Sequence, residues 1–550
     1  MITHPNRAAS LTRLQARLRS QDGFTMLLAL GVLMVTMLLT AAVFNAVQSD
    51  ATLTKSDLNS KQAYAGAQAG AQAYLYQLND NASNSAWWEN CANDTAGQTT
   101  PVAVPGTTTG ETYSFKPIYA NGSSAATCSS NPVQTLIDTG SGTLRIAFTG
   151  YAGTGGQAAQ RTIVASFRTL SPLSFLWYTV YETVDSSIGG SSCATFYYQG
   201  SGPPSSCDIY WVSGDHMNGP MYTQDQFNVY PGNSPTFGRA GTTDQIASQV
   251  PTKANNSEIC ASDNCYGATV SNAAPNVSPQ VPLPSDNSNL LTDATNHGIV
   301  YSGTVTLTIN SGGTTASGWD CTSATACTTI SNLDLTKYPI IYATNASGCN
   351  SAYDPTNVTY PRNTSGTYNG AYYGACGDIY ISGTYSTPLT LAAANDVIVT
   401  GNLLNSTDAS PTGTTSPTGG ATLGLVANQY VRVMHDASGC ASSNGNPNVT
   451  IDGAILTLQH SFFVDNYQCG GLPQGTLTVH GAIAQYFRGI VGSVGASGYL
   501  KNYNYDDRLG LILPPYLFDL QNTQWTVFRE TLCSPNAAAA SSNSCSYTGS

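Results

Sequence analysis

Two short stretches of the sequence carry residues that could do hydrolytic chemistry. IDTGSG at 137–142 holds Asp138 in an Asp-Thr-Gly turn, and acid–base hydrolysis at such a turn needs a second carboxylate to share the proton. GDHMNG holds the adjacent pair Asp215 and His216, which could belong to a triad or a metal site. The sequence has no second Asp-Thr-Gly or Asp-Ser-Gly and no GxSxG elbow for a nucleophile. A hairpin turn and a capped turn explain these residues more simply.

A third stretch, NYNYDDRLG, brings acids and a base together shortly after a lysine. Such a set could neutralise a uronate and abstract a proton; its members are Lys501, Asp506, Asp507 and Arg508. Salt bridges that close a turn explain the same residues more simply. The sequence therefore predicts no catalytic residue, no enzyme activity and no cofactor. Loop Asp and Asn oxygens could hold calcium, but no EF-hand loop or glycine-rich calcium repeat points to particular residues.

The 14 cysteines predict disulfide bonds rather than a metal cluster. None lies in the first 90 residues and no Cys-x-x-Cys occurs, and an even count of this kind fits an oxidising compartment. Zinc would need clustered cysteine and histidine ligands, whereas the six histidines are scattered. We expect each cysteine to bond its neighbour in the sequence, although the sequence does not prove the connectivity. The expected pairs are Cys91–Cys128, Cys193–Cys207, Cys260–Cys265, Cys321–Cys327, Cys349–Cys376, Cys440–Cys469 and Cys533–Cys545.

The composition indicates an exported protein rich in β-structure. Charged residues make up only 9% of the 550 residues, against about a quarter in ordinary soluble proteins, and Ser, Thr, Asn and Gly replace them. The formal net charge is −12, and beyond residue 23 the chain carries 15 basic and 30 acidic groups. Because this surplus of acids would repel a polyanion, we expect no nucleic-acid partner.

A long apolar segment follows an arginine-rich leader. The 24 residues of 24–47 include no charged residue, and a helix of about that length spans a hydrocarbon core of about 30 Å. Arginines before it and Asp50 and Asp57 after it predict a cytoplasmic N-terminus and a C-terminal part outside the membrane. A cleaved secretory signal with its cleavage site at Ala41-Ala42 is the competing interpretation.

Helical patterning continues beyond the apolar segment to Leu78 without a proline, so we predict one helix over 24–78. A stripe of mostly small residues runs along its second half at spacings of three and four. Small residues let another helix or a sheet approach closely. The stripe consists of Ala63, Ala67, Gly70, Ala71, Tyr74 and Leu78.

The rest of the chain predicts two β-rich regions. Short alternating strands indicate a small β-rich domain over 79–207, packed on the helix, and short β-runs separated by Gly and Asn turns recur over 208–530 before a tail at 531–550. Within the second region, IDGAILTL at 451–458 echoes VHGAIAQY at 479–486, and AANDVIVTG at 393–401 echoes VANQYVRVM at 426–434. These irregular repeats favour a right-handed parallel β-solenoid, with β-sandwich domains as the alternative.

The predicted fold class is therefore α+β and mostly β, with a long N-terminal transmembrane helix. One segment of the second region, NSTDASPTGTTSPTGG at 405–420, has the composition of a flexible, low-complexity loop.

The border Gly23-Phe24, followed by Thr25 and the apolar helix, resembles the type IV pilin-like family, including pseudopilins and PilX-type minor pilins. The stretch QAYAGAQAG is similar to the alanine- and glycine-rich helix of PilX-like proteins. In that family a prepilin peptidase cuts after a glycine and methylates the new N-terminal residue. The resemblance therefore implies a leader of 1–23 that is removed, and a mature chain that begins with N-methylated Phe24.

The resemblance departs from the family at one position. Most pilins carry a glutamate as the fifth mature residue, where this chain has Leu28. A glutamate in the membrane is costly without a partner, and in the family it is thought to pair with the amine of a neighbouring subunit. The K-type pseudopilins also lack it and stand at the filament tip, which implies that this chain is a minor or tip subunit.

The region from 208 onward resembles, more loosely, the β-helix-like domain attached to PilX-type N-termini in surface pilus-assembly proteins. The matching stretches are GDHMNGPMYTQDQF, TLAAANDVIVTGNL, IDGAILTL and GYLKNYNYDDRLGLILPPYLF.

These resemblances imply a structural subunit of a type IV pilus or of a type II secretion-like filament. It would stand at or near the tip and display a disulfide-stapled β domain for adhesion or assembly. Its expected partners are other pilin-like subunits, bound through the helix that carries Leu28 and the stripe, and also prepilin peptidase, the membrane, and a surface glycan or host ligand. It would be a single-pass protein of the cytoplasmic membrane that reaches the cell surface or pilus after assembly. The alternative is a membrane-tethered surface β-solenoid that binds or cleaves polysaccharide.

Overall fold

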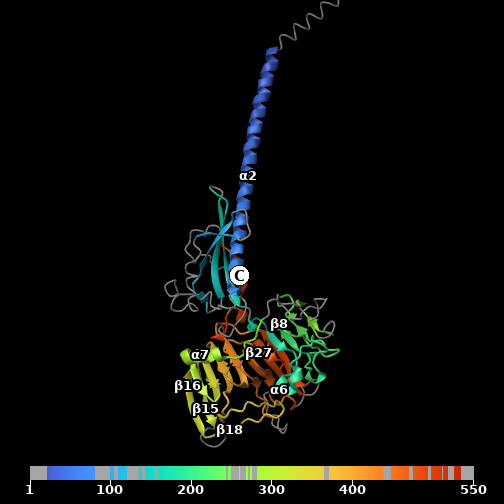
Figure 1. Ribbon diagram of the computed structural model, residues 1–550, viewed down its shortest axis with the longest axis vertical. Coiled ribbons are helices and arrows are strands. Elements are labelled where there is room, and N and C mark those ends of the chain that lie inside the picture. The colour runs from blue at the N-terminus through green and yellow to red at the C-terminus, as the bar shows by residue number, and fades with distance from the viewer. Residues whose placement is uncertain are drawn as a thin grey trace, which may run out of the picture.

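A long helix, a small antiparallel sheet and a large, mainly parallel sheet make up the computed structural model (Figure 1). Predicted features at 1–21, 81–99, 120–135 and 534–550, and at Cys440, lie outside the described residues. The structure describes residues 22–80, 100–104, 110–119, 136–138, 143–154, 158–169, 171–242, 244, 246–248, 259–260, 265, 268–270, 273–274, 281–363, 371–437, 447–469, 475–493, 497–510, 512–517 and 525–533.

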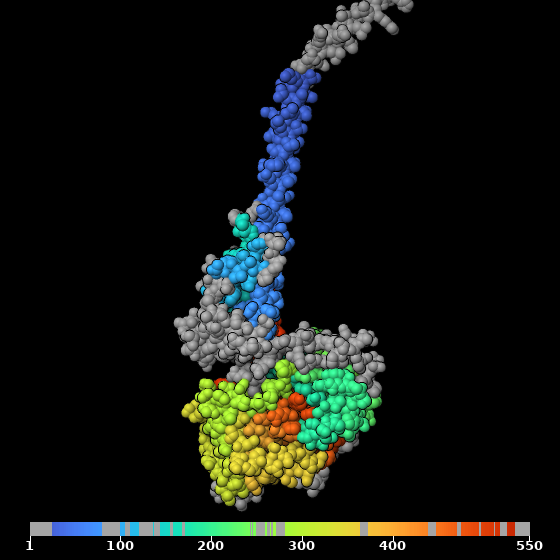
Figure 2. All heavy atoms as spheres, in the orientation of Figure 1, coloured from blue at the N-terminus to red at the C-terminus, as the bar shows by residue number. Residues whose placement is uncertain are grey.

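Helix α2 spans Asp22–Asp80 without interruption, so the prediction of one helix over 24–78 is confirmed. Its 59 residues give a length of about 88 Å at the rise of an α-helix. Residues 25–58 are exposed throughout, and the molecule's other parts begin to cover the helix only at Asn59. Figure 2 shows the first half of α2 projecting clear of the β-rich parts.

The small sheet is antiparallel and packs on the second half of α2. Its strand order is β1-β2-β4-β5-β30, with β3 paired to β4. In β4 the apolar residues alternate with polar ones, so Leu144, Ile146 and Phe148 all face the core. The strands are β1 (Val102–Ala103), β2 (Thr112–Pro117), β3 (Ile137–Asp138), β4 (Thr143–Ala152), β5 (Ala159–Thr169) and β30 (Trp525–Leu532).

The large sheet carries most of the hydrophobic core. Its strands are short, and many are buried along their whole length, as expected when both faces of a parallel strand are covered. Strand β25 is an example, because all nine of its residues are buried. The strands are β6 (Trp177–Tyr181), β7 (His216–Asn218), β8 (Met221–Thr223), β9 (Thr236–Phe237), β10 (Ile246–Ser248), β11 (Thr269–Val270), β12 (Ala273–Ala274), β13 (Ile299–Ser302), β14 (Thr304–Ile309), β15 (Thr315–Ser323), β16 (Ala326–Asp334), β17 (Ile340–Thr344), β20 (Ile379–Tyr385), β21 (Leu389–Ala393), β22 (Val397–Asn405), β23 (Leu423–Ala427), β24 (Val431–Val433), β25 (Val449–Thr457), β26 (Phe462–Val464), β27 (Gly475–Phe487), β28 (Gly492–Ser493) and β29 (Ser497–Tyr505).

Three parallel ladders run through this sheet. The first has the order β12-β10-β8-β6-β27-β25-β23-β21-β17-β13. The second has the order β11-β9-β7-β29-β27-β25-β22-β20-β14. In the third, β14-β20-β22-β24-β26, the pairs are again parallel. Antiparallel pairs occur where the hairpin β14-β15-β16 projects and where β28 meets β29.

The order of the first ladder differs from the order of the chain. Strand β6 lies between β8 and β27, so the chain enters this sheet at its middle and runs outward to β12. It then passes helix α7 (Ser288–His297) to β13 at the opposite end and returns strand by strand to β27. Figure 1 shows the outcome as green strands around β8 and yellow-green strands around β16, with orange β27 between them.

Short elements complete the described chain and lie between the strands. They are the helix α6 (Ser186–Gly189), the 3-10 turns η2 (Pro172–Ser174), η3 (Ser191–Cys193), η4 (Ser205–Cys207) and η7 (Asp507–Gly510), and the two-stranded sheet of β18 (Arg362–Asn363) and β19 (Ala371–Tyr372).

Sheet membership divides the chain differently from the expected regions 79–207 and 208–530. Strand β6 falls in the first region by sequence but pairs with β27 and β8 of the large sheet. Strand β30 lies at the end of the second region and pairs with β5 of the small sheet. The small sheet is therefore built from strands that come before and after the large sheet in the sequence.

Four of the seven expected cysteine pairs are bonded in the described part of the chain. They are Cys193–Cys207, Cys260–Cys265, Cys321–Cys327 and Cys349–Cys376. Cys469 and Cys533 are also disulfide-bonded. Cys91, Cys128, Cys440 and Cys545 lie outside the described residues.

The segment 405–420, expected to be a flexible loop, lies instead against the large sheet. The carbonyl of Pro411 accepts from the Thr450 hydroxyl at 2.8 Å, and the Ser416 hydroxyl donates to the carbonyl of Tyr505 at 2.9 Å. Arg508 donates to the carbonyls of Thr418 and Gly419. Composition alone misses these contacts because all of the partners are distant in sequence.

Candidate functional site

The exposed half of helix α2 is the most extensive apolar surface among the described residues. Met26, Met34 and Leu38 are each 69–70% exposed, and the residues around them are exposed to a similar degree. This half covers 34 positions, 25–58, or about 50 Å of helix. Among the described residues, α2 is the one helix long and apolar enough to cross a membrane. It is compatible with a membrane anchor.

The residues expected at the processing border lie at the beginning of α2. Gly23 and Phe24 belong to its first turn. Leu28 follows one turn later, and its side chain is 59% exposed. Met26 and Leu30 lie on the opposite side of the helix and are also exposed, so Leu28 keeps the exposed surface around this turn free of charge.

The stripe of small residues in the second half of α2 is covered by the small sheet. Ala63, Ala67, Gly70 and Ala71 are buried, and Tyr74 and Leu78 continue the same buried face. Tyr74 packs edge-on against Phe115 and Phe148, with ring centroids 5.2 and 5.7 Å away. Of the two partners that small residues admit, a helix or a sheet, the structure has the sheet. Any neighbouring subunit must therefore contact α2 elsewhere.

Gly150 of β4 shows how closely the sheet approaches α2. A Cβ atom placed on Gly150 would lie 1.9 Å from the carbonyl oxygen of Ala63 and 2.4 Å from the amide nitrogen of Ala67. Glycine is therefore required on the strand as well as small residues on the helix. Among the residues that the structure describes, none packs on the N-terminal half of α2 in this way, so one continuous helix is divided into a packed half and an exposed half.

Of the three sequence stretches considered for catalysis, the first lies in the small sheet, whereas the second and third lie on the paired strands β7 and β29 of the large sheet. Asp138 lies in β3 opposite Thr143 of β4, at a hairpin. Asp215 is buried, whereas the adjacent His216 is exposed and its Nδ1 lies 3.0 Å from the Thr236 hydroxyl. The two side chains thus face different surroundings.

The charges of NYNYDDRLG are distributed over three ion pairs. Lys501 pairs with Asp215 at 2.8 Å, and Arg508 pairs with Asp506 at 2.7 Å. Asp507 pairs with Arg239 at 2.7 Å. Burial lowers the pKa of Lys501 below its ordinary value, although Asp215 opposes this. The buried Lys501–Asp215 ion pair therefore links GDHMNG to the lysine that precedes NYNYDDRLG.

A second buried charge pair lies beside the Lys501–Asp215 pair, and the sequence analysis did not single it out. Arg488 donates to Glu182 at 3.1 Å, and both side chains are fully buried. The Arg488 guanidinium carbon lies 3.9 Å from the centroid of the Trp211 ring. The indole nitrogens of Trp177 and Trp211 both donate to Glu182. In the sequence Glu182 directly follows the apolar strand β6 and Arg488 directly follows β27, and this was the available signal.

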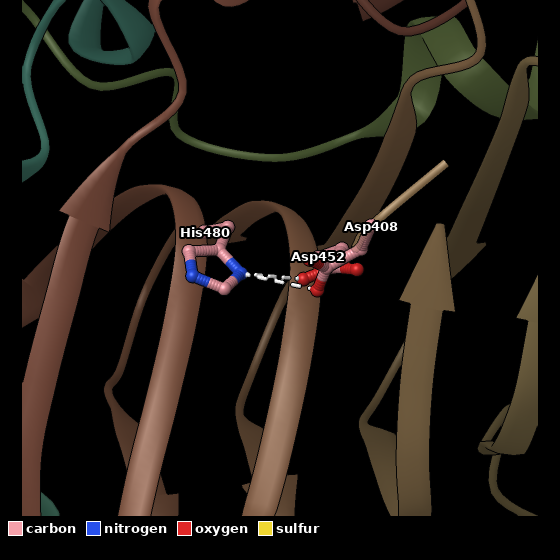
Figure 3. Close-up of side chains that lie close together, drawn as sticks. All are labelled: Asp408, Asp452 and His480. Carbon is pink, nitrogen blue, oxygen red and sulfur yellow. Dashed lines mark hydrogen bonds and ion pairs between the residues drawn. The ribbon is translucent and has the colours of Figure 1, made fainter. Parts of the chain in front are cut away.

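A further cluster could hold a metal ion, and it too was missed by the sequence analysis. Asp452 lies on β25 and His480 on the neighbouring β27, directly opposite each other in the parallel register. Figure 3 shows their side chains pointing toward each other, with Asp408 of the segment 405–420 beside them. One ligand atom from each residue lies within 4.8 Å of the other two.

The hydrogen bonds of this cluster are well defined. His480 Nδ1 lies 2.8 Å from Asp452 Oδ1 and 3.6 Å from Asp408 Oδ2. On the other side of the ring, Nε2 lies 3.1 Å from the carbonyl oxygen of Gly413. Burial by itself would lower the pKa of His480, but the hydrogen bond to Asp452 and its charge raise it above the ordinary value.

One signal for this cluster was present in the sequence. The echo of IDGAILTL in VHGAIAQY aligns Asp452 with His480, and the structure pairs these two residues. The contribution of Asp408 could not be predicted in the same way. Asp408 belongs to neither repeat but to the segment 405–420, which precedes both and folds back on the sheet.

No family model matches the chain, and no curated protein matches it. Among solved structures, the chain is similar to the crystal structure of the competence-associated pilin ComZ from Thermus thermophilus. The TM-score is 0.28 and the sequence identity is 12%, over 86% of this chain and 98% of that chain.

Proposed function

We propose that this chain is a minor, pilin-like structural subunit of a type IV pilus or a type II secretion-like filament. The observation that carries the proposal is the division of α2 into an exposed half, 25–58, that begins with the uncharged segment 25–47, and a half seated on the small sheet. Because the segment 25–47 is uncharged and predominantly apolar on every side, it needs lipid or neighbouring helices to cover it. In a pilin-like subunit, lipid would cover this segment in the membrane, and the helices of neighbouring subunits would cover it in the filament.

In this proposal the Gly23-Phe24 border is the processing site. Prepilin peptidase removes 1–23 in the cytoplasm and methylates Phe24, and the arginines of the leader hold that end inside. The β-rich part is then outside the membrane, where its disulfides form. Leu28 in place of the usual glutamate supports a position at or near the tip, where a subunit needs fewer neighbours.

We further infer that the large sheet is a right-handed parallel β-solenoid displayed at that tip. The support is the three ladders of parallel pairs, in which each strand pairs with the corresponding strand of the next repeat. A sandwich of Greek-key sheets would instead have antiparallel neighbours. In this proposal the domain supports the tip and binds a ligand, and no catalytic step is assigned to it.

A row of partly buried aromatic rings supports adhesion to a glycan. Tyr181 stacks on Phe196 with centroids 4.4 Å apart, and Phe196 stacks on Tyr198 at 5.1 Å. Tyr486 lies 5.7 Å from Tyr181 on the neighbouring strand. Flat rings with phenol hydroxyls offer an apolar face and a hydrogen-bonding edge together, which suits the two-sided character of a sugar ring.

Binding of the purified full chain to immobilised glycans tests the adhesive role. We expect Phe196→Ala to reduce binding strongly, because it removes the ring between Tyr181 and Tyr198. Tyr230→Ala, which alters a 42% exposed tyrosine outside the row, should bind like the wild type. Absence of glycan binding by the wild type, or equal binding by Phe196→Ala, counts against this ligand.

N-terminal mass analysis of the protein purified from its own membranes tests the processing step. The expected result is a mature chain that begins with N-methylated Phe24. An intact Met1 leader would contradict the proposal, and so would a start near residue 43, which indicates a secretory signal peptidase.

A point variant tests the same step through assembly. We expect Gly23→Ala to retain the leader and to stay out of the filament. Gly420→Ala is the control, because it makes the same change outside α2 and a Cβ at Gly420 would meet no atom within 4 Å. If Gly23→Ala is processed and assembled like the control, the pilin-like assignment is wrong.

A further inference from the structure

Three acceptor atoms converge in the cluster of Asp408, Asp452 and His480. The side chains of Asp452 and His480 are fully buried, and that of Asp408 is 1% exposed. Asp408 Oδ2 is buried and accepts no hydrogen bond within the described part of the chain. Buried carboxylate oxygens ordinarily have partners, so this oxygen requires an explanation.

The surrounding contacts turn each ligand atom toward the same point. Asp452 Oδ2 accepts from the amide of Asn405 at 2.7 Å, which leaves Oδ1 for His480. Asp408 Oδ1 accepts from the amide of Ser410 at 2.8 Å, which leaves Oδ2 free of a donor. Both carboxylates are therefore held by a backbone amide on the oxygen that faces away from the imidazole.

The imidazole is oriented in the same way. A carbonyl can only accept, so His480 Nε2 carries a hydrogen toward Gly413. Donation from the distal ring nitrogen to a carbonyl is the usual second contact of a metal-binding histidine, because it fixes the tautomer that leaves the other nitrogen free to bind. When Nδ1 carries no proton, it faces Asp452 Oδ1 and Asp408 Oδ2 as a third acceptor, and a metal cation bound there would replace the proton that otherwise joins Nδ1 to Asp452.

We propose that Asp408 Oδ2, Asp452 Oδ1 and His480 Nδ1 bind a divalent first-row transition-metal ion of the zinc(II) class. One nitrogen and two carboxylate oxygens suit such an ion and leave a fourth position for water. Calcium, which takes six to eight oxygen ligands, does not suit the imidazole. The site lies in the displayed domain, so it goes beyond the proposed assembly role and does not depend on it.

The bound ion would fix the segment 405–420 to the large sheet. Asp408 belongs to that segment, whereas Asp452 and His480 belong to β25 and β27. The segment is already joined to β25 through Pro411 and Thr450. A bond from Asp408 to the ion would add a second link between the segment and strands β25 and β27. Loss of the ion would release Asp408 from these strands.

Zinc titration of the detergent-solubilised, metal-stripped, tag-free full chain tests the site. We expect one zinc(II) per chain by mass spectrometry and a higher unfolding temperature with zinc than without. Asp408→Asn keeps the size of the side chain and removes the charged ligand. It should weaken zinc binding by at least about 100-fold, beyond the usual effect of losing an outer contact.

His460→Gln is the matched control. His460 Nδ1 also pairs with an aspartate, Asp185, at 2.9 Å, but it belongs to no cluster of three ligands among the described residues. It should bind zinc like the wild type. If the wild type shows no saturable zinc binding, or if Asp408→Asn binds as tightly, the site is instead a buried ion pair and the proposal fails.

Cobalt(II) titration of the wild-type chain gives a second measurement that needs no variant. Visible absorption bands of a nitrogen- and oxygen-ligated cobalt ion, displaced by one equivalent of zinc, are expected. Their absence overturns the proposal even if Asp408→Asn does not fold.

Discussion

Arg488 illustrates how much of this molecule depends on single buried charges. It lies against Trp211 and pairs with Glu182, and it also donates to the backbone carbonyls of Ile209 and Tyr210. Burying an ion pair is costly, but breaking one partner is costlier because the other charge remains in the interior. Removing either partner of the Arg488–Glu182 pair should therefore destabilise the large sheet.

We predict that Arg488→Met lowers the free energy of unfolding by about 3–5 kcal/mol. The reason is that Glu182 stays buried without its cation. Adding Glu182→Gln should recover part of the loss, and thermal or denaturant unfolding measures both changes. Lys61→Met, which removes an exposed ion pair with Asp57, should leave stability unchanged. An Arg488→Met protein as stable as the Lys61→Met control would contradict the prediction.

A second residue-scale prediction concerns the pH dependence of stability. Burial raises the pKa of Asp225 from its ordinary 3.8 to about 8. Between those values the folded chain holds a proton that the unfolded chain has lost. Its contribution therefore lowers the free energy of unfolding as the pH rises from about 4 to about 8, by at most about 1.4 kcal/mol per pH unit.

Unfolding measured across that pH range, with wild type and Asp225→Asn compared, checks this expectation. The amide cannot ionise, so the variant should lose the Asp225 part of the slope. Identical pH profiles would show that another group is responsible.

At the scale of elements, the contact between α2 and β4 decides which part of the helix is available to other molecules. The sequence has small residues on both sides of this contact, Ala63 and Ala67 on the helix and Gly150 on the strand. Together they let two backbones approach so closely that there is no room for a methyl group. The assembly surface proposed above is the remainder of the helix.

We predict that Gly150→Ala destabilises the small sheet by about 1–3 kcal/mol, the usual cost of overpacking. The new Cβ must move either β4 or the helix backbone at Ala63. Protection of the second half of α2 and of β4 from hydrogen exchange should fall. Gly420→Ala, where a Cβ meets no atom within 4 Å, serves as the control, and equal protection in both variants would refute the close approach.

The repeats of the large sheet show what sequence comparison can and cannot align. The echo at 451–458 and 479–486 coincides with the register of β25 and β27, residue for residue. The echo at 393–401 and 426–434 is one residue out of register, because the structure pairs Val397 with Val431. In so short a stretch the apolar pattern of a fully buried strand fits two registers about equally well, and the backbone ladder selects one.

At the scale of the whole molecule, the C-terminal end of α2 meets the last described strand, β30. The side chain of Asn79, at the end of α2, donates to the carbonyl of Trp525 at 2.9 Å and accepts from its amide at 2.7 Å. Glu530 accepts from Tyr64 and Gln68 of the same helix. Strand β30 therefore completes the small sheet only after the chain has passed through the large one.

We predict that Asn79→Ala costs about 1–3 kcal/mol, because it removes both hydrogen bonds that the Asn79 side chain makes with the backbone of Trp525. Hydrogen exchange should accelerate in β30 and β5 and remain unchanged in β25 and β27. Thr52→Ala, whose hydroxyl donates only within α2 to the carbonyl of Gln48, should change neither. Equal acceleration throughout both sheets would contradict a local role for this contact.

The sequence by itself determined the long helix, the mostly β character of the rest and four neighbouring disulfides, because each depends on local composition and periodicity. It also placed Asp452 and His480 at corresponding positions of a repeat. Only the tertiary structure decided that β6 enters the large sheet at its middle, that β30 returns to β5, and that Asp408 joins the other two residues. These features depend on contacts between residues far apart in the chain, and local pattern carries no information about which distant segments will pair.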